Sequence, residues 1–221
     1  MSTFNFKAFF NKYLEIYPEK PLPNIAFLEW LIGFSEGDAS FTLTLRRDIH
    51  FVITQSTTDV KILNYIRENL GFGSVYLQSL KQKTHRFIVQ DLINLQLICL
   101  LFNGNFVLPV RNAKFIIFLA SLNEKLIKKN LNIILPSYNL IVPTLQDFWL
   151  SGFVDAVGCF SVTMYENNNK FLIRFILVQK WLVNKIVLDH ILNLFSNVAN
   201  KTVGYVNKHS QENVWELVYM V

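Results

Sequence analysis

The feature that most constrains this chain is an internal duplication. Residues 27–41, with the sequence FLEWLIGFSEGDASF, are echoed by residues 146–160, with the sequence QDFWLSGFVDAVGCF. The echo continues downstream, where residues 51–55 (FVITQ) parallel residues 175–179 (FILVQ). A duplication of this length predicts a fold made of two similar units, because each copy carries the same pattern of positions to bury.

Within each copy the sequence predicts a helix, two strands, a second helix and two more strands. Asn24 is a predicted N-cap of the first helix, and Thr144 with Asp147 resembles a capping box before its counterpart. Apolar and polar residues then alternate, as in strands with one buried face. The predicted strands are 40–46, 50–56, 73–78 and 84–90 in the first copy and 160–165, 171–180, 201–206 and 213–219 in the second. The second helices are predicted at 59–70 and 182–195, with further helices at 92–102 and 111–129.

This order of elements predicts the α+β class with antiparallel hairpins. We expect an N-terminal extension over residues 1–23, a first repeat over 24–130, a linker over 131–143 and a second repeat over 144–221. Because both repeats lie in one chain, the fold requires no homo-oligomer.

The composition narrows the classes of function. Hydrophobic residues make up 52% and charged residues 17% of the 221 residues, which excludes a disordered chain. No apolar run approaches the roughly 20 residues of a membrane span, and the N-terminal residues lack a secretory signal pattern. A net charge of +5 favours polyanionic partners such as nucleic acids. The richness in Phe, Ile, Leu, Asn and Lys is typical of AT-rich coding sequence, which indicates an organelle genome, most simply a mitochondrial one.

The cysteines and histidines predict no metal centre. Cys99 and Cys159 lie far apart without a CxxC spacing or a nearby histidine pair, so neither zinc nor a disulfide is indicated. We expect both thiols to be buried as small hydrophobic groups. The four histidines are scattered along the chain.

The two matched helices resemble the motif of the LAGLIDADG homing endonucleases and maturases, at residues 31–39 (LIGFSEGDA) and 150–158 (LSGFVDAVG). The resemblance extends from about residue 24 to residue 221. It implies two pseudo-symmetric αββαββα repeats, whose motif helices pack together at the centre and whose antiparallel sheets form a saddle for the DNA major groove. Small residues one helical turn apart suit such close packing, namely Gly33, Gly37, Gly152 and Ala156.

The resemblance also implies a nucleic-acid surface on the strands. With the apolar strand faces turned toward helices, the opposite faces become candidates for contacts with bases and phosphates. The candidate residues are Thr42, Thr44, Arg46, Thr163, Tyr165, Arg174 and Lys180.

In the family, the last acidic residue of each motif binds divalent metal at the scissile phosphates. Carboxylates suit this task because Mg²⁺ prefers hard oxygen ligands and clamped metal ions activate water. Asp38 occupies the position in the first copy and would be the metal ligand. Val157 occupies it in the second copy and offers no ligand atom, so the sequence predicts a damaged catalytic centre.

Neighbouring residues do not replace the lost acid. Asp155 precedes Val157 by two residues, a step that turns a side chain by about 200° around a helix. By the resemblance, Glu36 and Asp155 are equivalent and are expected to brace the helices. Gln55 and Gln179 match a position that in relatives orders water or contacts DNA near the cleavage site.

The resemblance further implies a shortened second repeat. Family repeats continue past their fourth strand into helices with a basic residue, as the first copy does through Arg111 and Lys114. The second copy stops at Val221, so we expect its sheet to be covered by something else, such as another protein of a ribonucleoprotein.

These features favour a homing-endonuclease-derived protein that is catalytically inactive and retained for binding RNA. Such a protein would be an intron-encoded maturase or a structural component of an organelle ribonucleoprotein such as the mitochondrial ribosome, and would require no cofactor. Duplex DNA is the alternative target. The runner-up function is a Mg²⁺-dependent DNA homing endonuclease that cleaves weakly, or nicks one strand, through Asp38 alone. A pseudogene product without function is a third hypothesis.

Overall fold

The computed structural model describes residues 3–44, 48–165 and 170–220. The predicted order of elements occurs twice. Its first occurrence comprises α2 (Ile25–Asp38), β1 (Ala39–Leu43), β2 (Ile49–Ser56), a 3-10 turn (Thr57–Asp59), α3 (Val60–Leu70), β3 (Ser74–Ser79) and β4 (Thr84–Val89). Its second comprises α6 (Trp149–Val157), β5 (Gly158–Tyr165), β6 (Lys170–Lys180), α7 (Leu182–Ala199), β7 (Gly204–Lys208) and β8 (Val214–Met220). Helices α1 (Lys7–Ile16), α4 (Leu92–Phe102) and α5 (Pro109–Lys128) complete the described elements.

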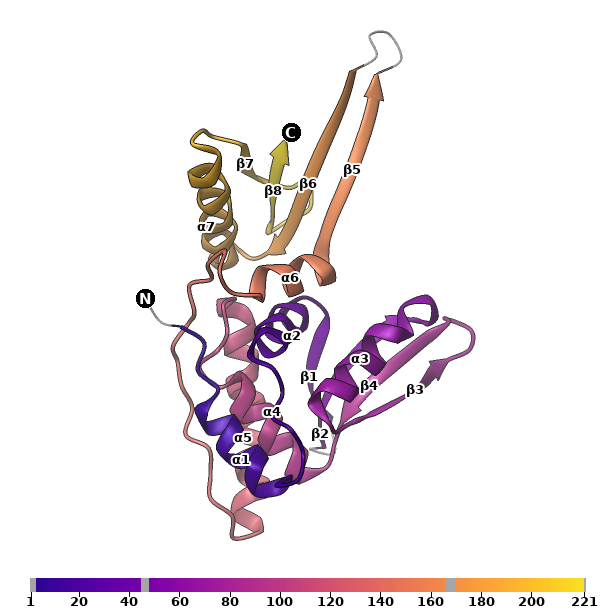
Figure 1. The fold of residues 1–221 in the computed structure, drawn as a ribbon, viewed down its shortest axis with the longest axis vertical. Coiled ribbons are helices and arrows are strands. Elements are labelled where there is room, and N and C mark those ends of the chain that lie inside the picture. The colour runs from indigo at the N-terminus through magenta and orange to yellow at the C-terminus, as the bar shows by residue number, and fades with distance from the viewer. Residues whose placement is uncertain (1–2, 45–47, 166–169, 221) are drawn as a thin grey trace.

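The strands form two antiparallel sheets of the same topology. The first sheet has the order β1-β2-β4-β3 and the second has the order β5-β6-β8-β7. The sheets extend from a central pair of helices, α2 and α6 (Figure 1). Helix α3 packs against β2, β3 and β4, and α7 packs against β6, β7 and β8. Helices α4 and α5 pack against β1 and β2, and α1 packs against α4. The predicted α+β class with a central helix pair and a saddle of two sheets is confirmed.

Several predicted boundaries of the helices and strands are wrong by a few residues. The first strand was expected to continue to residue 46, but β1 ends at Leu43. Thr144 and Asp147 do form a capping-box-like pair, since the Asp147 Oδ2 accepts hydrogen bonds from Thr144 N at 2.6 Å and Thr144 Oγ1 at 2.9 Å. Helix α6 nevertheless begins only at Trp149. Asn24 caps α2 as predicted, accepting a hydrogen bond from Ala26 N at 2.8 Å.

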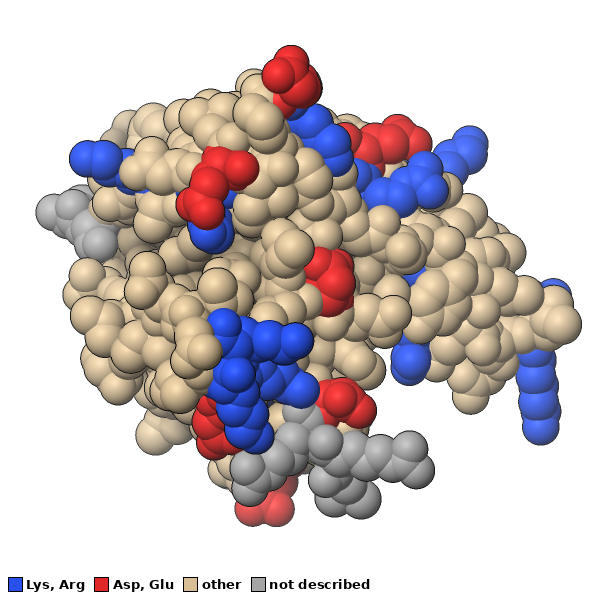
Figure 2. Space-filling model, turned by 90° about the horizontal axis from the view of Figure 1, so that it is seen from below, with Lys and Arg blue, Asp and Glu red and all other residues tan. Residues whose placement is uncertain are grey.

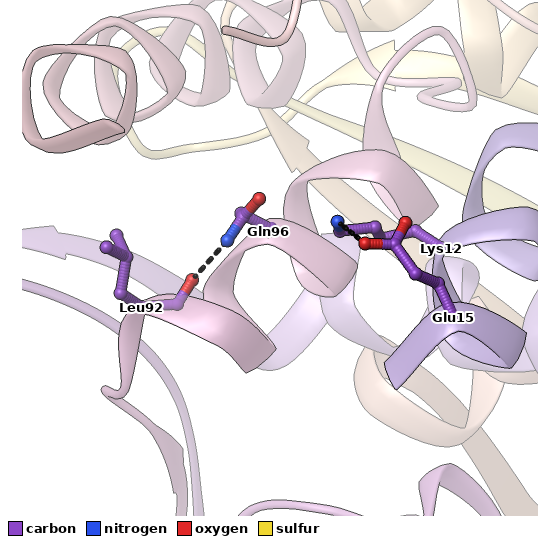
Figure 3. Close-up of polar contacts among 4 residues, drawn as sticks. All are labelled: Lys12, Glu15, Leu92 and Gln96. Carbon is purple, nitrogen blue, oxygen red and sulfur yellow. Dashed lines mark hydrogen bonds and ion pairs between the residues drawn. The ribbon is translucent and has the colours of Figure 1, made fainter. Parts of the chain in front are cut away.

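Aromatic side chains pack helix α1 against the rest of the molecule. Phe9 and Tyr13 are buried, and the Tyr13 hydroxyl donates to the Leu70 carbonyl at 3.0 Å. Figure 3 shows the polar contacts that accompany this packing, an ion pair between Lys12 and Glu15 on α1 and a hydrogen bond from Gln96 to the Leu92 carbonyl on α4.

Two predictions from composition have different outcomes. No helix in the described ranges combines the length and the apolar sequence that crossing a bilayer requires. Cys99 is buried as expected, but Cys159 is exposed, so its predicted burial is wrong. Cys159 lies on β5 opposite Ile176, on the face of the second sheet that points away from the core cluster.

Helices α2 and α6 touch through their backbones. A Cβ added to Gly33 would lie 2.0 Å from the Trp149 carbonyl oxygen, and one added to Gly152 would lie 1.9 Å from the Trp30 carbonyl oxygen. Contacts this short leave no room for any side chain. The two glycines therefore fix how closely the helices approach, as their predicted role requires.

The helix pair is braced by a reciprocal exchange of hydrogen bonds. The Trp30 indole Nε1 donates to Asp155 Oδ2 at 2.8 Å, and the Trp149 indole Nε1 donates to Glu36 Oε2 at 2.5 Å. Glu36 also accepts from the backbone N–H groups of Val107, at 3.1 Å, and Leu108, at 2.6 Å. Burial raises the pKa of Glu36 to about 7, although these donors and the charge of Arg111 oppose the rise.

Gly33→Ala should strongly destabilise the fold, because its methyl group would force α2 and α6 apart against the Trp149 carbonyl. We expect the free energy of unfolding to fall by about 3 kcal/mol, at the upper end of overpacking effects. Urea denaturation followed by circular dichroism measures the change. Ser151→Ala, at an exposed position of α6, is the matched control and should stay within about 0.5 kcal/mol of the parent. Equal stability of the Gly33 and Ser151 variants would contradict the backbone contact.

Glu36 should make stability depend on pH. Its pKa is raised from 4.5 in the unfolded chain to about 7 in the folded protein. Its contribution is therefore fully present below about pH 4.5 and is lost as pH rises through about 7. Glu36→Gln should remove a decline on the order of 3 kcal/mol across this window. Urea denaturation of both proteins at pH 4.5, 5.5 and 7 gives the difference in unfolding free energy, and a difference independent of pH would show that Glu36 does not titrate there.

Candidate functional site

The C-terminal end of α2 carries the acidic residue predicted for metal binding. We call the C-terminal ends of α2 and α6 the two helix feet. Asp38 is half-buried at the last position of the helix and accepts a hydrogen bond from Gln55 Nε2 at 2.5 Å. Burial raises the pKa of Asp38, while the Gln55 hydrogen bond and the charge of Arg111 oppose the rise. The structure thus brings Asp38 together with Gln55, two residues that the family resemblance assigned to the region of the cleavage site.

Arg111 caps the C-terminal end of α2. Its Nη1 donates to the Ala39 carbonyl at 3.0 Å and its Nη2 donates to the Gly37 carbonyl at 2.7 Å. A cation is favourable here because the C-terminal carbonyls of a helix carry partial negative charge. The structure therefore places a structural cap, provided by the start of α5, beside the Asp38 carboxylate.

The foot of α6 has no equivalent acid. Val157 ends this helix and packs against the core cluster, with its Cγ1 3.0 Å from where a Cβ on Gly37 would stand. Gln179, the counterpart of Gln55, has other partners, since its Nε2 donates to the Val178 carbonyl at 2.9 Å and its Oε1 accepts from Asn184 at 3.4 Å. Asp155 is engaged with Trp30. The two helix feet therefore differ in chemistry although they match in backbone.

These residues fit a divalent metal only in part. Within the described ranges, no group of three or more His, Cys, Asp and Glu side chains could hold a metal ion. Asp38 supplies one carboxylate, and Mg²⁺ is often held by one or two carboxylates together with substrate phosphates and water. The donor set thus suits one ion shared with a phosphate, but not a clamp with a carboxylate on each side.

The second part of the candidate site is the polar face of each sheet, the face opposite the core. Residues paired across strands share a face, so the register assigns its members. The polar face of the first sheet includes Thr42, His50, Thr54 and Arg86, and that of the second includes Ser161, Thr163, Arg174, Lys180 and Glu216. Four of the predicted candidates therefore lie on polar faces: Thr42, Thr163, Arg174 and Lys180.

The other three candidates are placed differently. Thr44 was expected on a strand, but it lies beyond β1, where its N–H donates to the Asp48 carbonyl at 2.9 Å and its Oγ1 accepts from Asp48 N at 3.0 Å. Thr44 therefore lies one residue beyond the end of β1, and its bonds to Asp48 continue the register of Leu43 with Ile49. Arg46 and the side chain of Tyr165 lie outside the described part of the chain.

Each polar face carries an arginine held against the sheet by a threonine. Arg86 Nε donates to Thr54 Oγ1 at 3.3 Å in the first sheet, and Arg174 Nη2 donates to Thr163 Oγ1 at 3.3 Å in the second. Arg86 was missed by the sequence analysis. The alternation in residues 84–89 could have found it, because Arg86 lies between His85 and Phe87 on the opposite face.

A further group of cations lies far from the helix feet. Lys125, Lys128 and Lys129 line a hollow of about 290 Å³ with Asp48 and His50, where α5 ends. Figure 2 shows the molecule from this end, where a group of Lys and Arg side chains lies beside acidic side chains. Lys125 pairs with Asp48 at 3.8 Å. Fourteen residues of helix separate Arg111 from Lys125, about 20 Å, so this group does not join the Asp38 site.

Comparisons with known proteins agree with this geometry. The family model described as LAGLIDADG endonuclease matches residues 31–122 and 150–220. Probable intron-encoded endonuclease 4 of Neurospora crassa is 40% identical over 158 residues, which are 70% of this chain and 28% of that protein. Intron-encoded RNA maturase bI4 of Saccharomyces cerevisiae is 30% identical over 163 residues, which are 74% of this chain and 23% of that protein. The chain thus spans about a quarter of the length of these relatives.

Among solved structures, the LAGLIDADG meganuclease I-AabMI bound to uncleaved DNA has the same fold. Its TM-score is 0.65 at 22% sequence identity, covering 87% of this chain and 78% of that one. The family model matches one segment in each copy of the duplicated order, and the two segments make up more than half of the chain. The chain therefore belongs to the LAGLIDADG endonuclease family.

Proposed function

We propose that this protein binds nucleic acid across the polar faces of its two sheets, prefers RNA, and does not cut its target. The observation that carries the proposal is the inequality of the two helix feet. Asp38 supplies a carboxylate at one foot, and Val157 supplies a packed methyl group at the other.

The chemistry of strand cleavage explains why this inequality matters. Hydrolysis of a phosphodiester with metal assistance needs an ion that activates water and stabilises the leaving oxygen. Cutting both strands needs this arrangement twice. Asp38 and a nucleic-acid phosphate can share one ion, whereas Val157 at the foot of α6 offers no ligand atom. The second negative charge is also lost, which lowers the attraction of the site for any cation.

The features that position a nucleic acid are retained. The glycine contacts and the exchanged tryptophan bonds keep the helix pair together. Each polar face keeps an arginine that is anchored by a threonine and lies on the sheet surface. Arginines so placed can meet phosphates or base edges, which supports a binding function that survives the loss of chemistry.

The proposed preference for RNA and the proposed organelle location are supported by the names of the relatives. One relative is named an RNA maturase, and both are named as intron-encoded. We therefore infer that this chain derives from an organelle genome, in keeping with its AT-rich residue usage, and acts in an organelle ribonucleoprotein. Intron RNA and ribosomal RNA are the two classes of target to be compared.

A second candidate function is nicking of one DNA strand with Mg²⁺. The pair of Asp38 with Gln55 and the adjacent Arg111 favour it, because the first helix foot keeps its polar partners. Nicking of one strand would need only the foot of α2, which carries Asp38.

Cleavage assays separate the two proposals. We expect the purified protein with Mg²⁺ to leave duplex DNA of an intronless organelle genome uncut and without nicks, as measured by sequencing of DNA ends. Val157→Asp would restore a carboxylate at the second foot and is the variant in which activity should emerge. Mg²⁺-dependent nicks in the parent protein that disappear with Asp38→Asn would establish the nicking function instead.

Binding assays test the polar faces. Arg86→Ala and Arg174→Ala should each weaken RNA binding and lower the slope of log affinity against log salt by about 1, the change expected for one lost phosphate contact. Lys7→Ala, exposed on α1, is the control and should change neither. RNA that co-purifies with the protein, identified by sequencing, would give the target class. Tighter binding to duplex DNA than to RNA in competition would overturn the RNA preference.

A further inference from the structure

The polar face of the second sheet also carries a row of side chains that are largely apolar. The register aligns one residue from each of β5, β6, β8 and β7, in that order, namely Cys159, Ile176, Val218 and Tyr205. We call these four residues the apolar row, because residues paired across strands share a face. Its two outer members face solvent, since Cys159 is exposed and Tyr205 is 40% exposed. Val178 extends the apolar surface along β6 and is 39% exposed.

The equivalent row of the first sheet has polar edges. The duplicated segments match Gln55 with Gln179, which identifies the members of this row as Ser40, Val52, Ile88 and Ser74. Serines therefore stand at both edges of the first sheet, where the second sheet has Cys159 and Tyr205. The two copies share the apolar centre of the row and differ at its edges, and only the second row includes an aromatic ring.

The neighbouring row reverses a charge between the two sheets. Arg86 pairs with Thr54 on the first sheet, and Glu216 pairs with Val178 at the equivalent position of the second. Arg86 donates to Thr54, whereas Glu216 has no hydrogen bond or ion pair within the described ranges. A carboxylate repels phosphates, but it can accept hydrogen bonds from the N–H groups on the Watson–Crick edges of unpaired bases. This part of the second sheet therefore suits bases better than backbone.

Two cations flank the apolar residues of β6. Arg174 and Lys180 lie on the same face as Ile176 and Val178, because residues two apart on a strand point the same way. Six residues of strand separate the two cations, about 20 Å. Their charges suit phosphates at the two ends of a strand whose bases meet the apolar surface between them. Such a combination of cations with an aromatic ring is typical of surfaces that bind single strands.

We propose that the apolar row, together with Val178 and Glu216, binds unpaired bases of a single-stranded RNA segment. The ring of Tyr205 stacks on one base, and Glu216 accepts a hydrogen bond from a base N–H group. Arg174 and Lys180 contact the phosphates on either side. This inference rests on the proposed function and adds that the target is unpaired where it crosses the second sheet. A duplex does not suit this surface, because its base faces are stacked on each other and cannot reach the ring.

Binding of a fluorescently labelled oligo(U) RNA to the full chain at low salt, measured by anisotropy, tests the stacking. Tyr205→Leu keeps an apolar side chain on the sheet but removes the ring. It should weaken binding about tenfold, the scale of one lost stack between a base and an aromatic ring. The slope of log affinity against log salt should not change, because no charge is lost. Tyr205→Phe keeps the ring and should bind like the parent, as should the control Tyr138→Leu, which alters an exposed tyrosine outside both sheets.

A duplex of oligo(A) with oligo(U) measures the preference for unpaired bases. We expect the duplex to bind the parent more weakly than oligo(U) does, and Tyr205→Leu to leave the affinity for the duplex unchanged. Glu216→Arg copies the charge of the first sheet and should strengthen binding of the duplex more than binding of oligo(U), because it favours phosphates. Glu212→Arg, at an exposed position before β8, is the matched control and should leave the ratio of the two affinities unchanged.

The possible outcomes separate this inference from the proposed function. Tyr205 and Glu216 are both partly exposed, so circular dichroism should show their variants folded. If Tyr205→Leu binds oligo(U) as tightly as the parent does, or if the duplex binds as tightly as oligo(U), the inference is wrong and RNA binding by the protein still stands. If the parent binds neither RNA, the inference and the proposed function both fail.

Discussion

The structure depends on one contact, the meeting of two helix backbones at Gly33 and Gly152. The Trp149 and Trp30 carbonyls occupy the space where side chains would otherwise stand, and this contact sets the separation of α2 and α6. Each sheet begins directly at the end of its helix, so the placement of both polar faces follows from it. The exchanged tryptophan bonds then fix the rotation of each helix against the other, because each indole reaches a carboxylate in the opposite copy.

The contacts that hold the helix pair together are separate from the residues proposed for chemistry at the helix ends. The central contact uses backbone atoms, and the braces use Glu36 and Asp155, neither of which lies at the position proposed to bind metal. On the proposed function, Val157 stands where relatives carry an acid, so a ligand is lost without disturbing the helix pair, because Val157 packs against the core cluster. A protein of this design can lose catalysis and keep its shape. The surroundings of the two helix feet differ accordingly, since Arg111 of α5 donates to the carbonyls of Gly37 and Ala39 at the first foot.

Much of the fold follows from sequence, because the deciding interactions are local or periodic. The duplication predicts both sheets, alternation predicts their faces, and Asn24 predicts the start of α2. The errors have physical causes. Thr44 lies one residue beyond β1, although its hydrogen bonds to Asp48 continue the register of Leu43 with Ile49. Helix α6 starts late because Thr144 and Asp147 bond to each other in a non-helical segment. The partners of Glu36 come from residues 107, 108 and 149, so no local pattern could reveal them. The family resemblance assigned Asp38 and Gln55 to the region of the cleavage site but did not predict the hydrogen bond between them.

The backbone contact between the helices also sets how the protein can respond to what it binds. Packed side chains can change rotamer and let two elements slide, but a glycine against a carbonyl oxygen has no alternative conformation to adopt. The spacing between the polar faces is consequently stiff. A nucleic acid that spans both sheets must bend or change its groove width to match them, and the energy of that deformation depends on its sequence. Selectivity would then arise partly from the mechanical properties of the target, at positions that no side chain touches.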